Sequence, residues 1–132
     1  MRFATTLAAL AVISSPVQTS EQPIRVSPDG RTHVQILLES GQASMSRITA
    51  FPGAAIPEHA HEGSDELLLI EEGSGEMTLG AERITVGPGQ AIRIPKGVKH
   101  SFKHTGKGPL RATQVYAPPG PEQRFKKWKE LR

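Results

Sequence analysis

Short β-prone runs alternate with turn residues from His33 onward, and this spacing limits what the chain can fold into. Clusters of Gly, Pro, Ser and Asp separate the runs, and no long stretch has helical periodicity. The pattern predicts nine strands, at His33–Glu39, Met45–Phe51, Ile56–His61, Glu66–Glu71, Glu76–Leu79, Arg83–Val86, Ala91–Ile94, His100–His104 and Leu110–Tyr116. Nine short strands at this spacing are typical of an all-β sandwich or barrel.

Three glycine-containing segments give the turns a more specific interpretation. Gly73-Ser74-Gly75 and Gly80-Ala81-Glu82 predict hairpin connections, because glycine reaches the backbone angles that tight turns need. Gly87-Pro88-Gly89 cannot continue a central strand, since proline has no N–H to donate to a sheet. We therefore expect hairpins at the first two segments and the end of a strand at the third.

The length and charge of the chain exclude several classes of protein. With 132 residues it suits one domain, and a formal charge of +3 is too small to imply nucleic acid as a partner. There are no cysteines, so disulfides, zinc knuckles, iron-sulfur clusters and thiol nucleophiles are excluded. Any metal ion must be held by nitrogen and oxygen ligands.

The first twenty residues, 1–20, resemble a secretory signal peptide. A short basic start at Met1 and Arg2 is followed by a mostly apolar run from Phe3 to Ile13 and then by small residues. The run is shorter than the roughly 20 apolar residues that span a bilayer, so no stable membrane insertion is expected. We predict export to the periplasm or the medium. The alternative is a cytoplasmic protein whose N-terminal segment covers the barrel.

The proline-rich run from Ala117 to Pro121 is expected to stop the last strand. We accordingly assign residues 33–117 to the domain and residues 118–132 to a basic C-terminal tail. The tail spaces Phe125, Trp128 and Leu131 three apart among basic residues, which predicts a short amphipathic helix. Its aromatic side chains would pack on the barrel; the alternative is that its basic face contacts an anionic surface.

A pair of histidines is the first sign of a metal site. His59 and His61 lie two apart in a predicted strand, so both imidazoles project from the same face, about 7 Å apart along the backbone. Glu66 is an odd number of residues further on, which would place it on the opposite face of a continuous strand. Residues 62–65, Glu-Gly-Ser-Asp, form a turn sequence instead, so Glu66 can open a new strand and face inward.

The strand that Glu66 opens is predicted to be buried on both faces. Leu68 and Ile70 share the face of Glu66 and extend an apolar lining, while Leu67 and Leu69 pack on the other face. An ionised carboxylate in such a place needs a cation or hydrogen-bond donors, since otherwise it takes up a proton.

His100 is the fourth candidate ligand. It follows the turn from Ile94 to Lys99, where Pro95 and Gly97 mark a bend that can bring the next strand beside the first two histidines. Together with His59, His61 and Glu66 this gives three imidazole nitrogens and one carboxylate oxygen. The alternative is a metal-free barrel whose cavity groups satisfy one another or bind water.

These residues resemble the two motifs of the cupin superfamily, over about residues 44–116. The first motif is matched at every position by Gly53, His59, His61, Glu66 and Gly73, with gaps of five, one, four and six residues. The second is matched by Gly89, Pro95, Gly97 and His100, with gaps of five, one and two. Its usual final Asn is His104 here, a position that is not a metal ligand in the family.

The resemblance implies a cupin jelly-roll β-barrel that holds one divalent transition metal, commonly iron, manganese, nickel, zinc or copper. His59, His61, Glu66 and His100 would be its ligands. It also implies a homodimer. The leading functional hypothesis is a metal-dependent enzyme of oxygenase type acting on a small organic substrate, with Glu66 as the candidate catalytic residue. The alternatives are a cupin isomerase and a non-catalytic module that binds or senses a small ligand.

Several other polar residues have no firm role in this interpretation. Some cupin lyases place a Tyr two residues after the Glu ligand, but position 68 is Leu, which argues against a similar lyase mechanism. His104 is expected at the surface before a turn, with a place in the cavity lining as the alternative, and His33 is a strand residue outside both motifs. Arg93 faces either the cavity or solvent. Solvated turn carboxylates are expected at Glu58, Glu62 and Asp65, with contacts to the metal ligands as the alternative.

Overall fold

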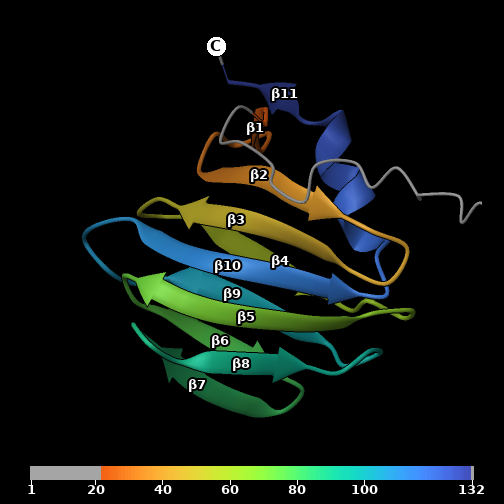
Figure 1. The fold of residues 1–132 in the computed structure, drawn as a ribbon. Helices are drawn as coiled ribbons and strands as arrows, with labels where there is room; N and C mark the ends of the chain where they lie inside the picture. The colour runs from red at the N-terminus through yellow and green to blue at the C-terminus, as the bar shows by residue number, and fades with distance from the viewer. Residues whose placement is uncertain (1–21, 132) are drawn as a thin grey trace, which may run out of the picture.

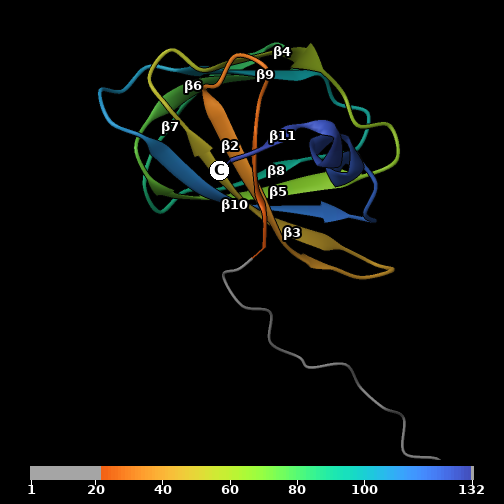
Figure 2. The same ribbon diagram turned by 90° about the horizontal axis from the view of Figure 1, so that it is seen from above.

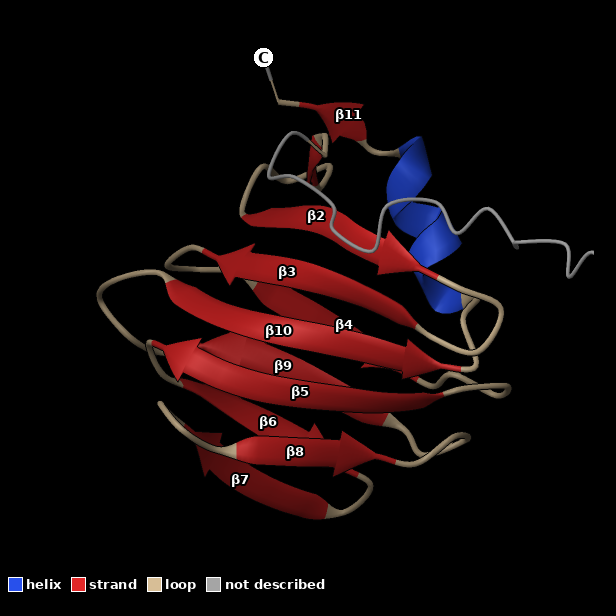
Figure 3. Cartoon of the chain, viewed as in Figure 1, coloured by secondary structure: helices blue, strands red, loops and turns tan. Residues whose placement is uncertain are grey.

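The computed structural model describes residues 22–131, so the predicted signal segment, residues 1–20, lies outside the described residues. Those residues form two antiparallel sheets (Figures 1 and 3), ordered β11-β1-β2-β3-β10-β5-β8 and β4-β9-β6-β7. The elements are β1 (Ile24–Val26), β2 (Thr32–Glu39), β3 (Ser44–Ala50), β4 (Ala55–His59), β5 (Asp65–Glu72), β6 (Gly75–Leu79), β7 (Glu82–Val86), β8 (Ala91–Ile94), β9 (His100–His104), β10 (Leu110–Ala117), the 3₁₀ helix η1 (Pro121–Lys127) and β11 (Lys129–Glu130).

The two sheets face each other and enclose a barrel, as Figure 2 shows from above. The chain crosses repeatedly between them, so that β3, β5, β8 and β10 belong to the large sheet and β4, β6 and β9 to the small one. This connectivity confirms the predicted all-β jelly-roll. All nine predicted strands are present, and their ends differ from the predicted ones by at most two residues.

The core lies between the sheets because each strand turns alternate side chains inward. On β10 the inward positions carry Leu110, Ala112, Gln114 and Tyr116, all buried. The apolar cluster between the sheets consists of Ala50, Ala54, Ile70, Met77, Val86, Ile94, Leu110 and Ala112. The polar residues at the other end of β10, Gln114 and Tyr116, mark where this apolar core gives way to the site described below.

The outer face of β5 is exposed, so the prediction that both faces are buried is wrong. Leu67 and Leu69 are 42% and 46% exposed. No element among the described residues covers the large sheet there, and an antiparallel sheet can leave one face in solvent. Leu67 stands opposite Val115 of β10, which stands opposite Met45 of β3. An apolar row thus crosses the outside of the sheet.

Gly73-Ser74-Gly75 is not the predicted hairpin, because β5 and β6 belong to different sheets. It forms a corner at which Gly73 adopts φ +83° and lies against Pro109 and Leu110, so that a Cβ there would come within 2.5 Å of the Pro109 carbonyl oxygen. The connection at Gly80, by contrast, is the predicted hairpin, since Leu79 of β6 pairs directly with Glu82 of β7.

The C-terminal segment contains the predicted short helix, which lies beside the end of β2 (Figure 1). Phe125 is buried and packs with Trp128 against the second apolar cluster, which includes Val34 and Tyr116. Leu131 does not share this packing and is 51% exposed, because the chain becomes extended at Trp128 and β11 pairs with β1 instead. No helix in the described part of the chain is long and apolar enough to cross a membrane.

Candidate metal centre

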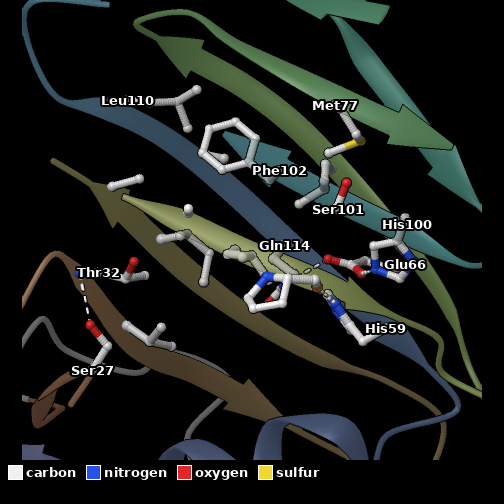
Figure 4. A pocket seen from close by; sticks show the side chains of 18 of the residues that line it. Ser27, Thr32, His59, Glu66, Met77, His100, Ser101, Phe102, Leu110 and Gln114 are labelled. Carbon is white, nitrogen blue, oxygen red and sulfur yellow. Dashed lines mark hydrogen bonds and ion pairs between the residues drawn. The ribbon is translucent and has the colours of Figure 1, made fainter. Parts of the chain in front are cut away.

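Side chains from both sheets meet in the space between them, where Figure 4 shows His59, Glu66 and His100 pointing toward one another. His59 ends β4 and stands opposite His100, the first residue of β9, while His61 follows β4. One ring nitrogen of each of the three imidazoles lies within 4.8 Å of the others. Glu66 reaches this group from β5 of the facing sheet. The structure therefore brings all four predicted ligands together.

Backbone carbonyls orient two of the three imidazoles. Nδ1 of His59 lies 2.8 Å from the carbonyl oxygen of Pro57, and Nδ1 of His100 lies 2.9 Å from that of Val98. A carbonyl oxygen only accepts, so each Nδ1 carries the proton and donates it. In the neutral ring Nε2 then keeps a free lone pair, which is the form in which an imidazole binds a metal ion.

The turn before β9 connects the ligands to one another. The backbone N–H of Gly97 donates to the carbonyl oxygen of His61 at 2.8 Å, and that of Val98 donates back to Pro95 at 3.1 Å. Val98 also accepts from His100, as described above. The Pro-x-Gly spacing of the second motif therefore positions His61 and His100 through the backbone.

Three buried polar atoms at this point have no hydrogen-bond partner. Oε2 of Glu66 lies 3.4 Å from Nε2 of His61 and 3.3 Å from Nε2 of His100, within ion-pair distance. The geometry of these contacts does not meet hydrogen-bond criteria, so all three atoms are unsatisfied. Unpaired buried polar atoms are costly. One cation among them would satisfy all three, so the residues fit a divalent metal ion.

The pKa values agree with this interpretation. Burial acts to raise the pKa of Glu66, but polar contacts with His100, His61 and Gln114 outweigh it and lower that pKa to about 2. Glu66 is therefore a carboxylate at neutral pH. Burial lowers the pKa of His59, which keeps that ring neutral. Burial also acts to lower the pKa of His100, but the nearby Glu66 raises it overall. The carboxylate of Glu66 thus favours a positive charge at this point, which is the charge that a metal ion would bring.

Two residues on β10 that the sequence interpretation missed hold Glu66 in place. The side-chain amide of Gln114 donates to Oε1 of Glu66 at 2.7 Å (Figure 4). The same amide donates to the hydroxyl of Tyr116 at 3.0 Å. The Tyr116 ring stacks edge-on against His61 at 5.0 Å between centroids. The alternation along β10 could have predicted this role for Gln114. It shares its face with Leu110 and Ala112, so its amide is buried among apolar side chains and needs a polar partner there.

A cavity of about 520 Å³ adjoins His59, Glu66 and His100. Its walls are mostly apolar, and Leu68 and Ile70 line it as predicted. Charged side chains are few. They are Asp29, Glu58, Glu66 and Arg124.

The remaining predicted polar residues lie away from the ligand atoms. His104 is buried rather than exposed, so that prediction is wrong; its Nε2 lies 2.7 Å from the carbonyl oxygen of Gly108, within the loop that follows β9. Arg93 faces solvent and lies 4.0 Å from Asp65. Asp65 also accepts from the backbone N–H of Lys96 at 2.9 Å. Glu58 and Glu62 are exposed.

The chain is similar in sequence to part of the xanthan biosynthesis protein XanB of Xanthomonas campestris pv. campestris. The two are 34% identical over 79 residues, which make up 59% of this chain and 17% of XanB. The chain therefore spans under a fifth of that relative's length.

Solved structures share the fold over most of the chain. KdgF from Halomonas sp. superposes with a TM-score of 0.72 at 19% identity, covering 81% of this chain and 98% of that one. A predicted oxalate decarboxylase from Thermotoga maritima superposes with a TM-score of 0.69 at 26% identity, covering 78% of this chain and 98% of that one.

A family assignment follows from the sequence itself. The profile of the Cupin domain matches residues 47–116, more than half of the chain. The matched stretch contains His59, His61, Glu66 and His100 and all strands from β4 to β9. The chain belongs to the cupin family.

Proposed function

We propose that the protein is a metal-dependent enzyme of oxygenase type that acts on a small organic molecule. The proposal rests on one observation: unsatisfied atoms of His61, Glu66 and His100 converge beside an apolar cavity. These residues and His59 would hold the ion. A redox-active ion such as iron or manganese, when bound, supplies dioxygen binding and polarisation of a substrate oxygen.

The ligand residues also set the charge and openness of the site. Three neutral imidazoles and one carboxylate reduce a divalent ion to about one net positive charge, which favours substrate oxyanions. An ion held by these four side chains would still have room for water, substrate or dioxygen. Leu68, Ile70 and the other apolar walls fit the carbon skeleton of a small organic molecule.

Oxygenase chemistry is favoured over isomerisation because the titratable groups nearest the ligands are poor proton carriers. Glu66 has a pKa of about 2 and is itself a candidate ligand. Burial and the negative charge of Glu66 raise the pKa of Tyr116, so its hydroxyl stays protonated. An isomerase needs a base that takes a proton from its substrate.

One observation nevertheless favours an isomerase as the second candidate. Glu58 lines the cavity one residue before His59. Its carboxylate forms no hydrogen bond or ion pair with the described residues. Its carboxylate could take up a substrate proton. The variant Glu58→Gln separates the two candidates, because it should abolish isomerisation and leave oxygen-dependent turnover unchanged.

Relatives support an enzyme over a simple binding module. The Thermotoga maritima protein is named as a predicted decarboxylase of oxalate, a small organic acid, and it shares 26% identity with this chain.

The first experiment measures which metal the protein carries when it is purified without added metal. The iron and manganese forms are then incubated with small enols and catechols, with and without air, in an oxygen electrode. We expect substrate-dependent oxygen uptake that the Glu66→Ala variant loses, including under conditions where it still binds metal. Oxygen uptake that is absent with every substrate would contradict the oxygenase proposal, and tight ligand retention without product would establish the binding module.

A further inference from the structure

Arg124 lies in the wall of the cavity, although it belongs to the C-terminal segment outside the predicted domain. It belongs to η1, next to the buried Phe125. It lines the cavity together with Phe125 and Trp128. Nη2 of Arg124 donates to the hydroxyl of Tyr116 at 3.3 Å. Its guanidinium carbon lies 4.8 Å from the centroid of the Phe125 ring. The residue as a whole is exposed, but these two contacts hold its guanidinium against the buried side chains of Tyr116 and Phe125 at the wall of the cavity.

The charge of Arg124 is not neutralised within the described part of the chain. No carboxylate there lies within 4 Å of it, whereas five other basic residues each form such an ion pair: Arg25, Arg83, Arg93, Arg111 and Lys126. An arginine side chain has five N–H donors in a planar fork that matches a carboxylate. Arg124 uses one of them in a single long hydrogen bond, so most of its donors are available to a ligand.

The three carboxylates that line the cavity do not neutralise Arg124. Asp29 is occupied by the hydroxyl of Ser27 at 2.6 Å and the backbone N–H of Arg31 at 3.0 Å. Glu66 is held by Gln114 and belongs to the ligand set. Glu58 is exposed and forms no ion pair with Arg124. Arg124 is the only lysine or arginine among the described lining residues, and no carboxylate compensates its charge.

Arg124 is also close to the metal ligands. Nη2 of Arg124 contacts the hydroxyl of Tyr116 at 3.3 Å, and that hydroxyl contacts Nε2 of Gln114 at 3.0 Å. The same Nε2 contacts Oε1 of Glu66 at 2.7 Å. Arg124 Nη2 therefore lies within about 9 Å of the Glu66 carboxylate. A ligand one aromatic ring long can therefore reach both the metal ion and the guanidinium.

We propose that Arg124 binds the carboxylate, or a similar oxyanion, of a small organic anion whose other oxygen atoms bind the metal ion. The proposal deepens the proposed function and rests on it: it names the substrate class as an anion with a short apolar body. The apolar walls accept the body, and the two cationic centres accept the two polar ends. In this role Arg124 determines specificity and takes no part in bond breaking.

The test uses two probes that differ only in charge. The zinc-loaded protein is titrated at physiological ionic strength with 3,4-dihydroxybenzoate and with its neutral isostere 3,4-dihydroxybenzamide, by calorimetry. Both can bind the ion through their two hydroxyl groups, and the first carries a carboxylate across the ring. We expect the wild-type protein to prefer the benzoate by about tenfold or more.

The variants separate Arg124 from the rest of the basic tail. Arg124→Gln should bring the affinity ratio of the two probes close to one, and Arg124→Lys should keep part of the preference. Lys127→Gln is the matched control, because Lys127 lies on the same helix but does not line the cavity. It removes the same charge and should leave the ratio unchanged. A general loss of structure would weaken the binding of both probes, whereas loss of the guanidinium alone should weaken binding of the benzoate and leave that of the benzamide unchanged.

The two proposals fail in different ways. A wild-type preference that persists in Arg124→Gln, or the lack of any preference in wild type, would overturn the role of Arg124 while leaving the metal site intact. Failure of the zinc-loaded protein to bind the neutral benzamide would contradict the metal-centred function, and the inference about Arg124 with it.

Discussion

Gln114 controls the orientation of Glu66, because its amide donates to the one carboxylate oxygen that does not face the imidazoles. Replacing it with leucine removes this donor and leaves Oε1 of Glu66 buried without a partner. We expect Gln114→Leu to weaken metal binding by about 10- to 100-fold, the usual effect of removing a residue that orients a metal ligand. Competition with a chromophoric chelator measures this loss.

A neighbouring residue provides the control. Thr113 lies on the same strand, and its hydroxyl contacts Glu71 at the surface. Thr113→Val should therefore leave metal affinity unchanged. Equal affinities in Gln114→Leu and wild type would show that Glu66 does not depend on this amide.

Two glycines separate backbone strain from steric contact. Gly73 and Gly89 have almost the same φ, +83° and +84°, but a Cβ at Gly73 would lie 2.5 Å from the Pro109 carbonyl oxygen, whereas at Gly89 nothing lies within 4 Å. Gly89→Ala should cost about 1 kcal/mol from its positive φ alone. Gly73→Ala should cost about 3 kcal/mol or more, because the backbone of the corner must also move. Urea denaturation compares the two, and equal losses would contradict the close contact.

At the residue scale, sequence reasoning predicted that the four candidate ligands come together but not what surrounds them. The spacing of His59 and His61 and the turn before Glu66 were enough to bring these side chains together, because they depend on local geometry. The burial of His104 and the exposure of Leu67 could not be predicted from local geometry. Whether they are covered depends on which loop or sheet face lies over them, and that is settled only when the whole barrel forms.

Among the elements, η1 depends on tertiary packing more than on helical propensity. It is a short 3₁₀ helix, and its contact with the barrel is made mainly by Phe125, which is 3% exposed. Phe125→Ala should lower the free energy of unfolding by about 3 kcal/mol, or the midpoint of thermal unfolding by on the order of 10 °C. Lys127→Ala, at an exposed position of the same helix, should change stability by less than about 0.5 kcal/mol. Calorimetry of both variants tests this, and similar midpoints would show that the helix is not anchored.

The elements that the sequence did not predict are β1 and β11. They have three and two residues, too few to show a period of two, and β11 pairs with β1 across almost the whole length of the chain. Arg25 of β1 and Glu130 of β11 reinforce this pairing at 3.3 Å. Such strands exist because the edge of β2 accepts β1 and β1 accepts β11, so no local pattern reveals them.

On the scale of the whole molecule, the barrel was predictable because turn spacing and strand alternation both constrain it. The crossing of the chain between sheets was not predictable from hairpin signals, as the corner at Gly73 shows. Export and a homodimer remain predictions. The apolar row of Leu67, Val115 and Met45 lies on the outer face of the large sheet, and its Leu67 and Met45 are exposed. Sedimentation of the wild-type protein and of the charged variant Leu67→Lys would test whether the protein self-associates through this face.

Metal binding should stabilise the entire fold, because its ligands come from two sheets that unfolding separates. A metal ion present at a hundred times its Kd adds about 2.7 kcal/mol to the free energy of unfolding, which should raise the unfolding midpoint by several degrees. We expect this rise with at least one of iron, manganese, nickel, zinc or copper, and we expect a chelator to reverse it. Differential scanning calorimetry of the metal-free and metal-loaded protein provides the measurement.

Histidine variants show whether the rise comes from the proposed site. His100→Ala removes one ligand and should abolish most of the increase. His33→Ala removes an imidazole that packs against Phe51, with ring centroids 4.8 Å apart, outside the cavity. It should lower the midpoint of the metal-free protein slightly and leave the metal-induced increase intact. An unfolding midpoint that no divalent ion changes in the wild-type protein would mean that the four converging side chains do not form a metal site, since an ion bound between the two sheets must oppose their separation.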